Sequence, residues 1–271
     1  MSSSDAPSAG SAGERARELL ALGAARGVQL RVLGGVAIAL RASPQTPPGL
    51  SRPSNDLDLA VEEGAGGRAG EILLDGGLVA LSERFNTLHG QRRLVFVGEQ
   101  QADLKVDVFV GDLEMCHTVP LRGRLELDPL TLTPTDLLLS KGQIVRLAPK
   151  DRLDLYCLLW NHEIDVGQAP SAERLPEAAI DAGYIAALCA RDWGWWRTLT
   201  ANLDVCRDEL PGASLQQADS ARIAERLSAL EQAIAAAPKS LRWRARDRVG
   251  ERVRWFEEPE EIGGVAGPDR L

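Results

Sequence analysis

The sequence predicts an α/β (α+β) fold in which a domain with a mixed sheet is followed by an α-helical C-terminal domain. Three β-rich segments, NDLDLAVEE, RRLVFVGE and DLKVDVFVGD, precede residue 130, and helical or turn-rich stretches lie between them. After residue 130, apolar residues recur at helical spacing and no strand is evident. The expected organisation is a flexible tail over 1–12, an α/β domain over 13–130, a helical domain over 131–256 and an acidic tail over 257–271.

The elements of the first half are predicted from periodicity and turn residues. Ala and Leu recur at helical spacing over 14–26, and Gly27 is a plausible end for that helix. VQLRVLGGVAIAL is typical of a short strand, a Gly-Gly turn and the start of a helix, whereas SPQTPPGLSRPS is a loop because it is rich in Pro, Ser and Gly. Residues 68–77 are expected to form a helix that Gly76 and Gly77 end.

The second half begins with a strong helix start. Thr133 and Pro134 suit the cap and the first turn, and Asp136 adds a negative charge where the helix dipole favours it. RDWGWWRTL brings three tryptophans together, which favours helix packing over a platform for stacked bases. The patterns predict helices over 134–147, 150–163, 173–190, 194–208, 218–236 and 240–256.

The last of these helices carries two parallel stripes. Leu241, Ala245, Val249 and Val253 recur at a spacing of four and are expected to pack on the helical domain. The arginines of LRWRARDRVGERVRWF would then face either solvent or the border of a binding cleft. The basic stripe consists of Arg244, Arg248 and Arg252.

Composition limits the classes of function. The 271-residue chain is 44% hydrophobic and 26% charged with a formal net charge of −8, so it is not built to bind nucleic acid by bulk charge, although a local basic patch remains open. No apolar run approaches the roughly 18 residues of a membrane span, and the N-terminus lacks a secretory core. No two of the four cysteines form a C-x-x-C pair, so we expect reduced thiols and a cytoplasmic protein without a membrane partner.

The segment Asp56-Leu57-Asp58 is the first candidate for chemistry. Side chains alternate along a strand, so Asp56 and Asp58 point to the same face while Leu57 and Leu59 point to the other. Adjacent carboxylates repel each other, and Mg²⁺ is the natural compensating charge because it prefers carboxylate and phosphate oxygens. Taken alone, the pattern is more typical of a solvated edge strand with two surface acids.

Two further features favour the metal-binding interpretation. Leu33-Gly34-Gly35 lies between a strand and a helix, where glycines allow a phosphate close to the backbone and the helix N-terminus adds donors. Asp107 is a single acid in the apolar run Lys105-Val106-Asp107-Val108-Phe109, which is costly unless the acid is paired or bound to metal. A phosphate cradle and three carboxylates together form the clamp used for in-line phosphoryl transfer.

These segments resemble a known signature. RVLGGVAIAL, RPSNDLDLAV and KVDVFV are similar to the Gly-Gly/Ser, Asp-x-Asp and third-acid motifs of nucleotidyltransferases of the DNA polymerase beta superfamily. TPTDLLLSKGQIVRLAPKDRLDLYCLL resembles the Lys helix and the Lys-Asp-x-x-Asp helix of the abortive-infection nucleotidyltransferases and related mycobacterial toxins. The resemblance covers roughly residues 28–162. Two departures are a longer spacer between Gly35 and Asp56, and Gly35 where many members have Ser.

The resemblance implies a metal-dependent enzyme. It would move a nucleoside monophosphate from a nucleoside triphosphate to a hydroxyl acceptor, with release of pyrophosphate, using Mg²⁺ or Mn²⁺. The acceptor would be an RNA or tRNA end or a small molecule, and an antitoxin-like protein would be a further partner. The alternative is a noncatalytic nucleotide-binding or regulatory member of the same fold.

The resemblance also assigns roles to residues. Asp56 and Asp58 would bind the metals, and Asp107 would complete the second metal site and help to deprotonate the acceptor hydroxyl. The positions implied for binding the triphosphate are Gly34, Gly35, Arg52, Ser54, Lys141 and Asp151.

Lys141 can also be argued from its helix. It shares a face with Leu137, Leu138, Ile144 and Val145, so its amine either extends to solvent or meets an anion. The resemblance favours the anion and places the amine near the acid cluster, across a cleft between the two halves. In the next helix Asp151 and Asp154 are both candidates to support Lys141, with a preference for Asp151. His89 remains either a base, a substrate contact or a structural residue.

Overall fold

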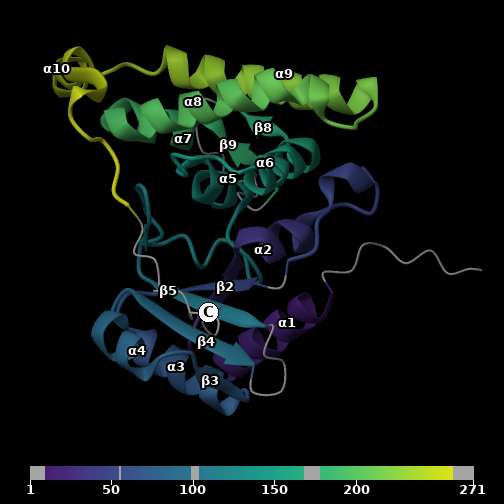
Figure 1. Cartoon of the computed structure of the whole chain (residues 1–271), viewed down its shortest axis with the longest axis vertical. Helices are drawn as coiled ribbons and strands as arrows, with labels where there is room; N and C mark the ends of the chain where they lie inside the picture. Colours follow the sequence, from purple (N-terminus) through teal and green to yellow (C-terminus); the bar gives the residue numbers. More distant parts are fainter. Residues whose placement is uncertain (1–9, 55, 99–103, 168–177, 259–271) are drawn as a thin grey trace, which may run out of the picture.

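A five-stranded mixed sheet lies beneath a helical layer in the computed structural model, which describes residues 10–54, 56–98, 104–167 and 178–258 (Figure 1). The strand order is β1-β2-β5-β4-β3, with β2 and β5 parallel and the other neighbours antiparallel, which confirms the predicted mixed sheet. The strands are β1 (Leu30–Leu33), β2 (Asp56–Val61), β3 (Leu78–Ala80), β4 (Arg93–Gly98) and β5 (Lys105–Val110).

Helices cover one face of this sheet because alternate strand residues are apolar. Leu57, Leu59, Val106 and Val108 are fully buried, and helices α1 (Gly10–Ala25) and α3 (Gly66–Asp75) contact the sheet through their own apolar sides. Gly77, at a φ of +79°, lies just after α3, in line with the predicted glycine stop. The residues of opposite parity, which include the acids, are left on the other face.

In the first half, most differences between the predicted and the observed elements concern short helices and strands. Helix α4 (Glu83–His89) is capped by Ser82, whose hydroxyl accepts from the backbone N–H of Phe85, yet none of its residues is buried. Such a helix has no apolar stripe to predict it from. Helix α1 begins at Gly10, inside the segment predicted to be a tail. The remaining elements are α2 (Gly34–Arg41), η1 (Pro48–Leu50), β6 (Leu113–Glu114) and β7 (Thr118–Val119).

The second half is helical, as expected, with one correction. Two short parallel strands, β8 (Ile164–Asp165) and β9 (Ile180–Asp181), flank a segment that partly lies outside the described residues, so the expectation of no strand there was wrong. The helices are α5 (Pro134–Gly142), α6 (Pro149–Asn161), α7 (Ala182–Arg191), α8 (Trp193–Glu209), η2 (Leu210–Gly212), α9 (Gln217–Ala236), α10 (Leu241–Val249) and η3 (Gly250–Arg252). None of the described helices is long and apolar enough to cross a membrane.

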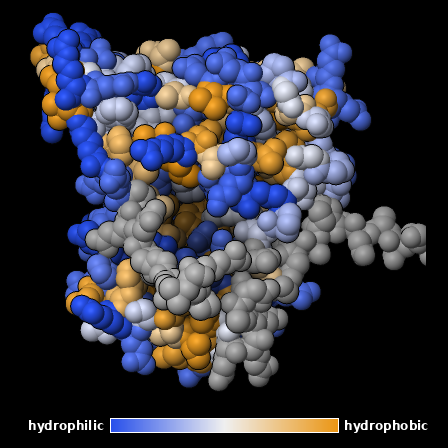
Figure 2. Space-filling view, in the orientation of Figure 1, coloured by the Kyte–Doolittle hydropathy of each residue, from blue (hydrophilic) through white to orange (hydrophobic). Residues whose placement is uncertain are grey.

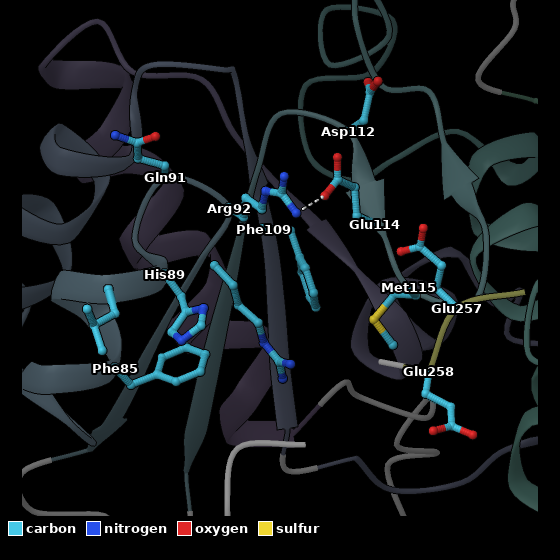
Figure 3. Close-up of a pocket in the computed structure, with 12 residues that line it drawn as sticks. Phe85, His89, Gln91, Arg92, Phe109, Asp112, Glu114, Met115, Glu257 and Glu258 are labelled. Atoms are coloured by element: carbon cyan, nitrogen blue, oxygen red, sulfur yellow. Dashed lines mark ion pairs between the residues drawn. The ribbon is translucent and has the colours of Figure 1, made fainter. Parts of the chain in front are cut away.

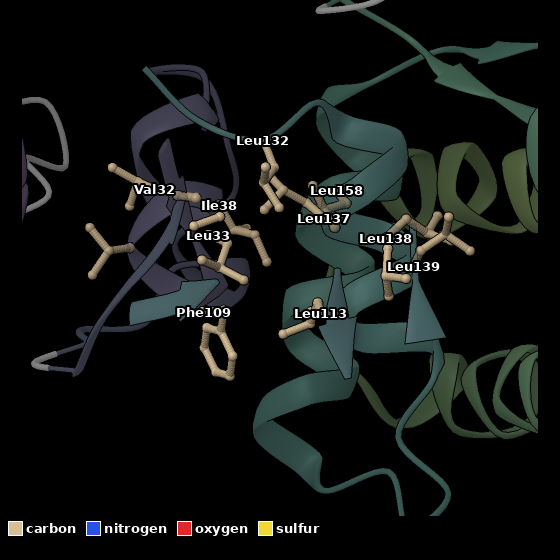
Figure 4. Packing of buried hydrophobic residues seen from close by; sticks show 14 of the residues in the cluster. Val32, Leu33, Ile38, Phe109, Leu113, Leu132, Leu137, Leu138, Leu139 and Leu158 are labelled. Carbon is tan, nitrogen blue, oxygen red and sulfur yellow. The ribbon is translucent and has the colours of Figure 1, made fainter. Parts of the chain in front are cut away.

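One hydrophobic core joins the two halves. Leu33 and Ile38, at the junction of β1 and α2, lie beside Leu137 of α5 and Leu158 of α6 (Figure 4). The connection is also made by backbone, since the Val32 N–H donates to the carbonyl of Leu130 and its carbonyl accepts from Leu132. The helical layer is therefore fixed above the acid-bearing half of the molecule by packing and by hydrogen bonds.

The tryptophans of α8 pack as predicted. Trp193 and Trp195 are buried, and the Trp195 indole donates to the carbonyl of Thr118 at 3.0 Å. The Trp193 and Trp196 rings lie 6.1 Å apart between centroids. These rings are part of the interior of the helical half rather than an open platform for bases.

Helix α10 contradicts the predicted apolar stripe. Leu241 is 82% exposed, and Ala245, Val249 and Val253 are exposed as well. The helix is instead held by Trp243, which is buried and donates its indole N–H to the carbonyl of Cys189 at 2.9 Å. An indole buries more apolar surface than a leucine and also satisfies its polar atom here, so it decides which face packs.

The position of α10 also contradicts the expectation that some of its arginines border a binding cleft. The helix packs against α8 at the end of the molecule far from the sheet (Figure 1). Arg244, Arg248 and Arg252 are exposed there. Figure 2 shows hydrophilic and hydrophobic side chains mixed at this corner (top left).

A pair of truncations tests this packing. Trp243→Ala is expected to lower the free energy of unfolding by about 3–5 kcal/mol, because it removes a buried aromatic ring. Leu241→Ala, two residues away on the same helix, is expected to change it by less than about 0.5 kcal/mol, because the side chain is in solvent. Urea unfolding of both variants measures the difference. Equal losses of stability would mean that Leu241 packs on the helical domain, as the apolar stripe predicted.

Candidate functional site

The three acids lie on the sheet face that α1 and α3 leave uncovered. In the parallel pairing of β2 with β5, Asp58 is opposite Asp107 and Asp56 is opposite Lys105. Paired residues of neighbouring strands project to the same side, so the expected common face of the acids is observed. Asp56 is exposed, Asp58 is partly buried and Asp107 is buried.

Asp58 is pressed against the start of helix α2. This helix follows β1 without an intervening turn, and its first residue, Gly34, has a φ of +71°. A Cβ atom at Gly34 would lie 2.0 Å from Oδ2 of Asp58, so only glycine allows this approach. The carboxylate of Asp58 and the N-terminal backbone of α2 therefore form a single unit.

The electrostatic environment of Asp58 is unfavourable to its charge. Burial, together with the neighbouring charges of Asp107 and Asp56, raises the pKa of Asp58 to about 7, while Lys141 and Arg93 act in the opposite direction. A carboxyl with this pKa gains from any added cation, since the added charge favours the ionised form. The site therefore lacks positive charge at Asp58.

A glycine substitution tests the contact between Asp58 and α2. Gly34→Ala is expected to destabilise the protein by roughly 1–3 kcal/mol and to displace the Asp58 carboxylate, because the new Cβ overlaps it. Gly27→Ala is the matched control: its φ is +65°, but no atom lies within 4 Å of the added Cβ. Thermal unfolding of both variants separates the overlap from the backbone strain, and equal losses would show that the overlap has no effect.

Lys141 lies between two carboxylates at the junction of α5 and α6. Its amine is 2.8 Å from Oδ1 of Asp151 and 2.9 Å from Oδ2 of Asp154, and its side chain is 12% exposed. Extension to solvent is therefore excluded. Both acids support the lysine, not Asp151 alone. Burial disfavours the charged amine, but Asp154 and Asp151 outweigh burial and raise the pKa of Lys141.

Asp154 also ties Lys141 to the loop before β2. Arg52 donates to both oxygens of Asp154, at 2.8 Å from Nε and 2.6 Å from Nη2. A Cβ atom at Gly35 would lie 2.7 Å from Nη2 of Arg52 and 3.1 Å from Oγ of Ser54. Gly35 therefore leaves the space that the guanidinium of Arg52 occupies. Gly34, Gly35, Arg52 and Ser54 all gather at the start of α2.

Asp107 has two cationic partners that sequence reasoning missed. Arg93 of β4 donates to Oδ1 of Asp107 from Nε at 2.9 Å, and Lys105 lies 2.9 Å from Oδ2. Lys105 lies two residues before Asp107 on the same strand, so the period-two alternation of side chains could have predicted that the two are neighbours on one face. Arg93 comes from the neighbouring antiparallel strand, and no local pattern indicates it.

The fit of the acids to a metal is partial. Within the described ranges, no group of three or more Asp, Glu, His or Cys side chains is arranged to hold a metal ion, so the expected convergence of all three carboxylates is not observed. Asp56 and Asp58 offer the hard oxygens that Mg²⁺ prefers, and no ion pair joins either of them to another described residue. Asp107 would have to break its ion pair with Arg93 or with Lys105 before its carboxylate could bind the same cation as Asp56 and Asp58.

His89 belongs to another part of the surface. Its ring stacks on Phe85 of the same helix, with the centroids 4.6 Å apart. It lines a hollow (Figure 3) together with Arg93, and Arg93 also forms the ion pair with Asp107.

No protein-family model matches the sequence, and no curated protein does.

Proposed function

We propose that the chain is a metal-dependent nucleotidyltransferase of the DNA polymerase beta superfamily. The observation that carries the proposal is the contact of Asp58 with Gly34 at the N-terminus of α2, in register with Asp107. This places a charge-deficient carboxyl beside backbone donors that favour an anion. A divalent cation would compensate the charge of Asp58, and the triphosphate bound with it would accept hydrogen bonds from the backbone donors. Neither a structural ion pair nor a solvated strand provides both.

The proposed reaction is an in-line displacement. The oxygen of the acceptor hydroxyl forms a bond to the α-phosphorus while the bond from that phosphorus to the bridging oxygen breaks, and pyrophosphate leaves with the electron pair. The hydroxyl proton passes to the carboxylate of Asp107 and then to water. Mg²⁺ or Mn²⁺, held by Asp56 and Asp58 and joined by Asp107, would neutralise charge on the phosphates.

The protein's own cations have a separate task. Lys141 and Arg52 are held by Asp154 on the side of the site formed by the helical half. A bound triphosphate would compete with Asp151 and Asp154 for these cations, and the backbone at Gly34 and Gly35 would contact its oxygens. The ion pairs keep the lysine and the arginine in place until the substrate arrives.

The decisive experiment is transfer of label. The protein is incubated with Mg²⁺ and each α-labelled nucleoside triphosphate, first with total RNA and then with a metabolite extract. The proposal expects one acceptor fraction to gain label with release of an equal amount of pyrophosphate, and Asp56→Asn to prevent both. Label transfer that persists in EDTA would contradict a metal-dependent reaction.

A noncatalytic binding protein is the second candidate. The observation that favours it is the pairing of Asp107 with both Arg93 and Lys105, which leaves this acid already neutralised. That candidate predicts that Mg²⁺ with a triphosphate raises the melting temperature although no acceptor gains label. Thermal shift and label transfer, measured on the same preparation, distinguish the two.

A further inference from the structure

Helix α10 presents a row of apolar side chains to solvent. Because successive residues of a helix are rotated by about 100°, Leu241, Ala245 and Val249 lie along the side opposite the buried ring of Trp243. Leu241 is 82% exposed and Val249 is 40% exposed. A single exposed leucine is ordinary, but here the apolar residues are aligned on a helix whose other side already packs on the molecule. Within the described part of the chain, the row has no partner.

Arginines flank this row on both sides. Arg244 and Arg248 lie along one edge of the row, and Arg242 lies along the other. All three are exposed, and their guanidinium groups form no ion pair with any described residue. Arg246, by contrast, is held against the protein, with its Cζ 4.4 Å from the centroid of the Trp193 ring. The three flanking arginines are therefore available to a partner.

The acids of this segment are already engaged. Asp247 accepts a hydrogen bond from the indole N–H of Trp193 at 2.7 Å, and Glu251 pairs with Arg197 at 2.6 Å. Residues 241–254 contain six arginines and two acids, whereas the whole chain has a formal net charge of −8. A negatively charged surface would therefore attract this corner of the molecule and repel most of the remainder, so the charge distribution also sets the orientation of the contact.

Shape and composition select among anionic partners. Helix α10 lies at a projecting corner of the molecule, so it can rest on a flat surface (Figures 1 and 2). A nucleic-acid backbone would pair with the arginines, but it would also place phosphates against the apolar row. The interface of a membrane with anionic lipids offers phosphates to the arginines and hydrocarbon to Leu241 and Val249, as for helices that lie in the plane of that interface.

We propose that α10 is a docking surface for a membrane that contains anionic lipids. The expectation of no membrane partner rested on the lack of an apolar span in the sequence, and a contact at the surface requires no span. The helix lies at the end of the molecule far from the sheet, so the acid cluster would stay away from the lipid (Figure 1). This contact is independent of nucleotidyl transfer, and either can fail without the other.

Co-sedimentation of the full chain with lipid vesicles tests the proposal. Vesicles of phosphatidylcholine and phosphatidylglycerol, mixed at about two to one, are expected to bind the chain at low salt, and vesicles of phosphatidylcholine alone are not. Binding should weaken as the salt concentration rises, because it depends on the charge of exposed arginines. Equal binding to both kinds of vesicle, or binding to neither, would overturn the proposal.

Two pairs of arginine variants locate the contact. Arg244→Gln/Arg248→Gln is expected to weaken binding to the anionic vesicles by roughly tenfold to thirtyfold, because each arginine near an anionic surface adds to the attraction. Arg68→Gln/Arg84→Gln removes the same charge from α3 and α4 at the sheet end and should have little effect. All four side chains are exposed, so both variants should keep the melting temperature of wild type. Equal losses of binding would mean that total charge, and not α10, controls it.

A leucine variant distinguishes a lipid interface from other partners. Leu241→Gln is expected to weaken vesicle binding by about threefold to tenfold, because the leucine leaves water on docking. Leu88→Gln, which changes a 67% exposed leucine of α4, is the control and should not weaken it. If a homopolymeric RNA binds through Arg244 and Arg248 while the vesicles do not bind, the surface belongs to a nucleic acid and the proposal is overturned. A dimer in ultracentrifugation that dissociates in Leu241→Gln would show that a second copy covers the row, and would overturn it as well.

Discussion

Asp58→Asn is expected to abolish nucleotidyl transfer and, in metal-free buffer at pH 8, to make the protein more stable. Burial and the charges of Asp107 and Asp56 raise the pKa of Asp58 from 3.8 to about 7. The folded state then binds a proton more tightly than the unfolded state, so stability falls as pH rises from about 4 to about 7. Asparagine cannot ionise, so the variant avoids this loss, which amounts to at most about 4 kcal/mol.

Urea unfolding in EDTA at pH 4 and at pH 8 measures the effect. The stability of the variant relative to wild type should be near zero at pH 4 and clearly positive at pH 8. Asp208→Asn, an exposed acid of α8, is the control and should show no such trend. With Mg²⁺ and a triphosphate added, wild type should gain stability and Asp58→Asn should not. A variant that is less stable than wild type at pH 8 would mean that the charge of Asp58 is already compensated.

Lys141→Ala is expected to prevent transfer and also to destabilise the protein by about 3–5 kcal/mol. The structure places the amine of Lys141 between Asp151 and Asp154, both of which are buried. Removing the lysine leaves these buried carboxylates without their shared cation, and this is far more costly than losing an exposed pair. Activity and stability should therefore fall together.

A second substitution separates the two roles. Lys141→Ala/Asp151→Asn removes one of the abandoned charges and should recover part of the lost stability, because Asp154 keeps Arg52 as a partner. Transfer should remain absent, because no cation reaches the triphosphate from this position. Urea unfolding and label transfer are measured on both variants. If transfer returns with stability, Lys141 is only a structural residue.

Local patterns predicted the part of the site that local geometry controls. The period-two alternation placed Asp56 and Asp58 on one face. The Gly-Gly pair before a helical run indicated a close approach of a phosphate, and the group that lies against Gly34 in the structure is the carboxylate of Asp58. Pairings between distant segments had no local signal. Arg93 reaches Asp107 across a strand pair, and Arg52 reaches Asp154 over more than one hundred positions of sequence. In α10, the spacing of small apolar residues was misleading because a single tryptophan determined the packed face.

The shared core between the halves has a consequence for how the chain unfolds. Leu33 and Ile38 bury their surface against Leu137 and Leu158, and the backbone of Val32 bonds to the segment that leads into the helical half. Neither half retains a complete interior alone, so the two are expected to melt in one cooperative transition rather than in two. A variant in either half then shifts the same melting curve. A fragment that ends near residue 130 would expose the apolar surface of β1 and α2 and would be prone to aggregate.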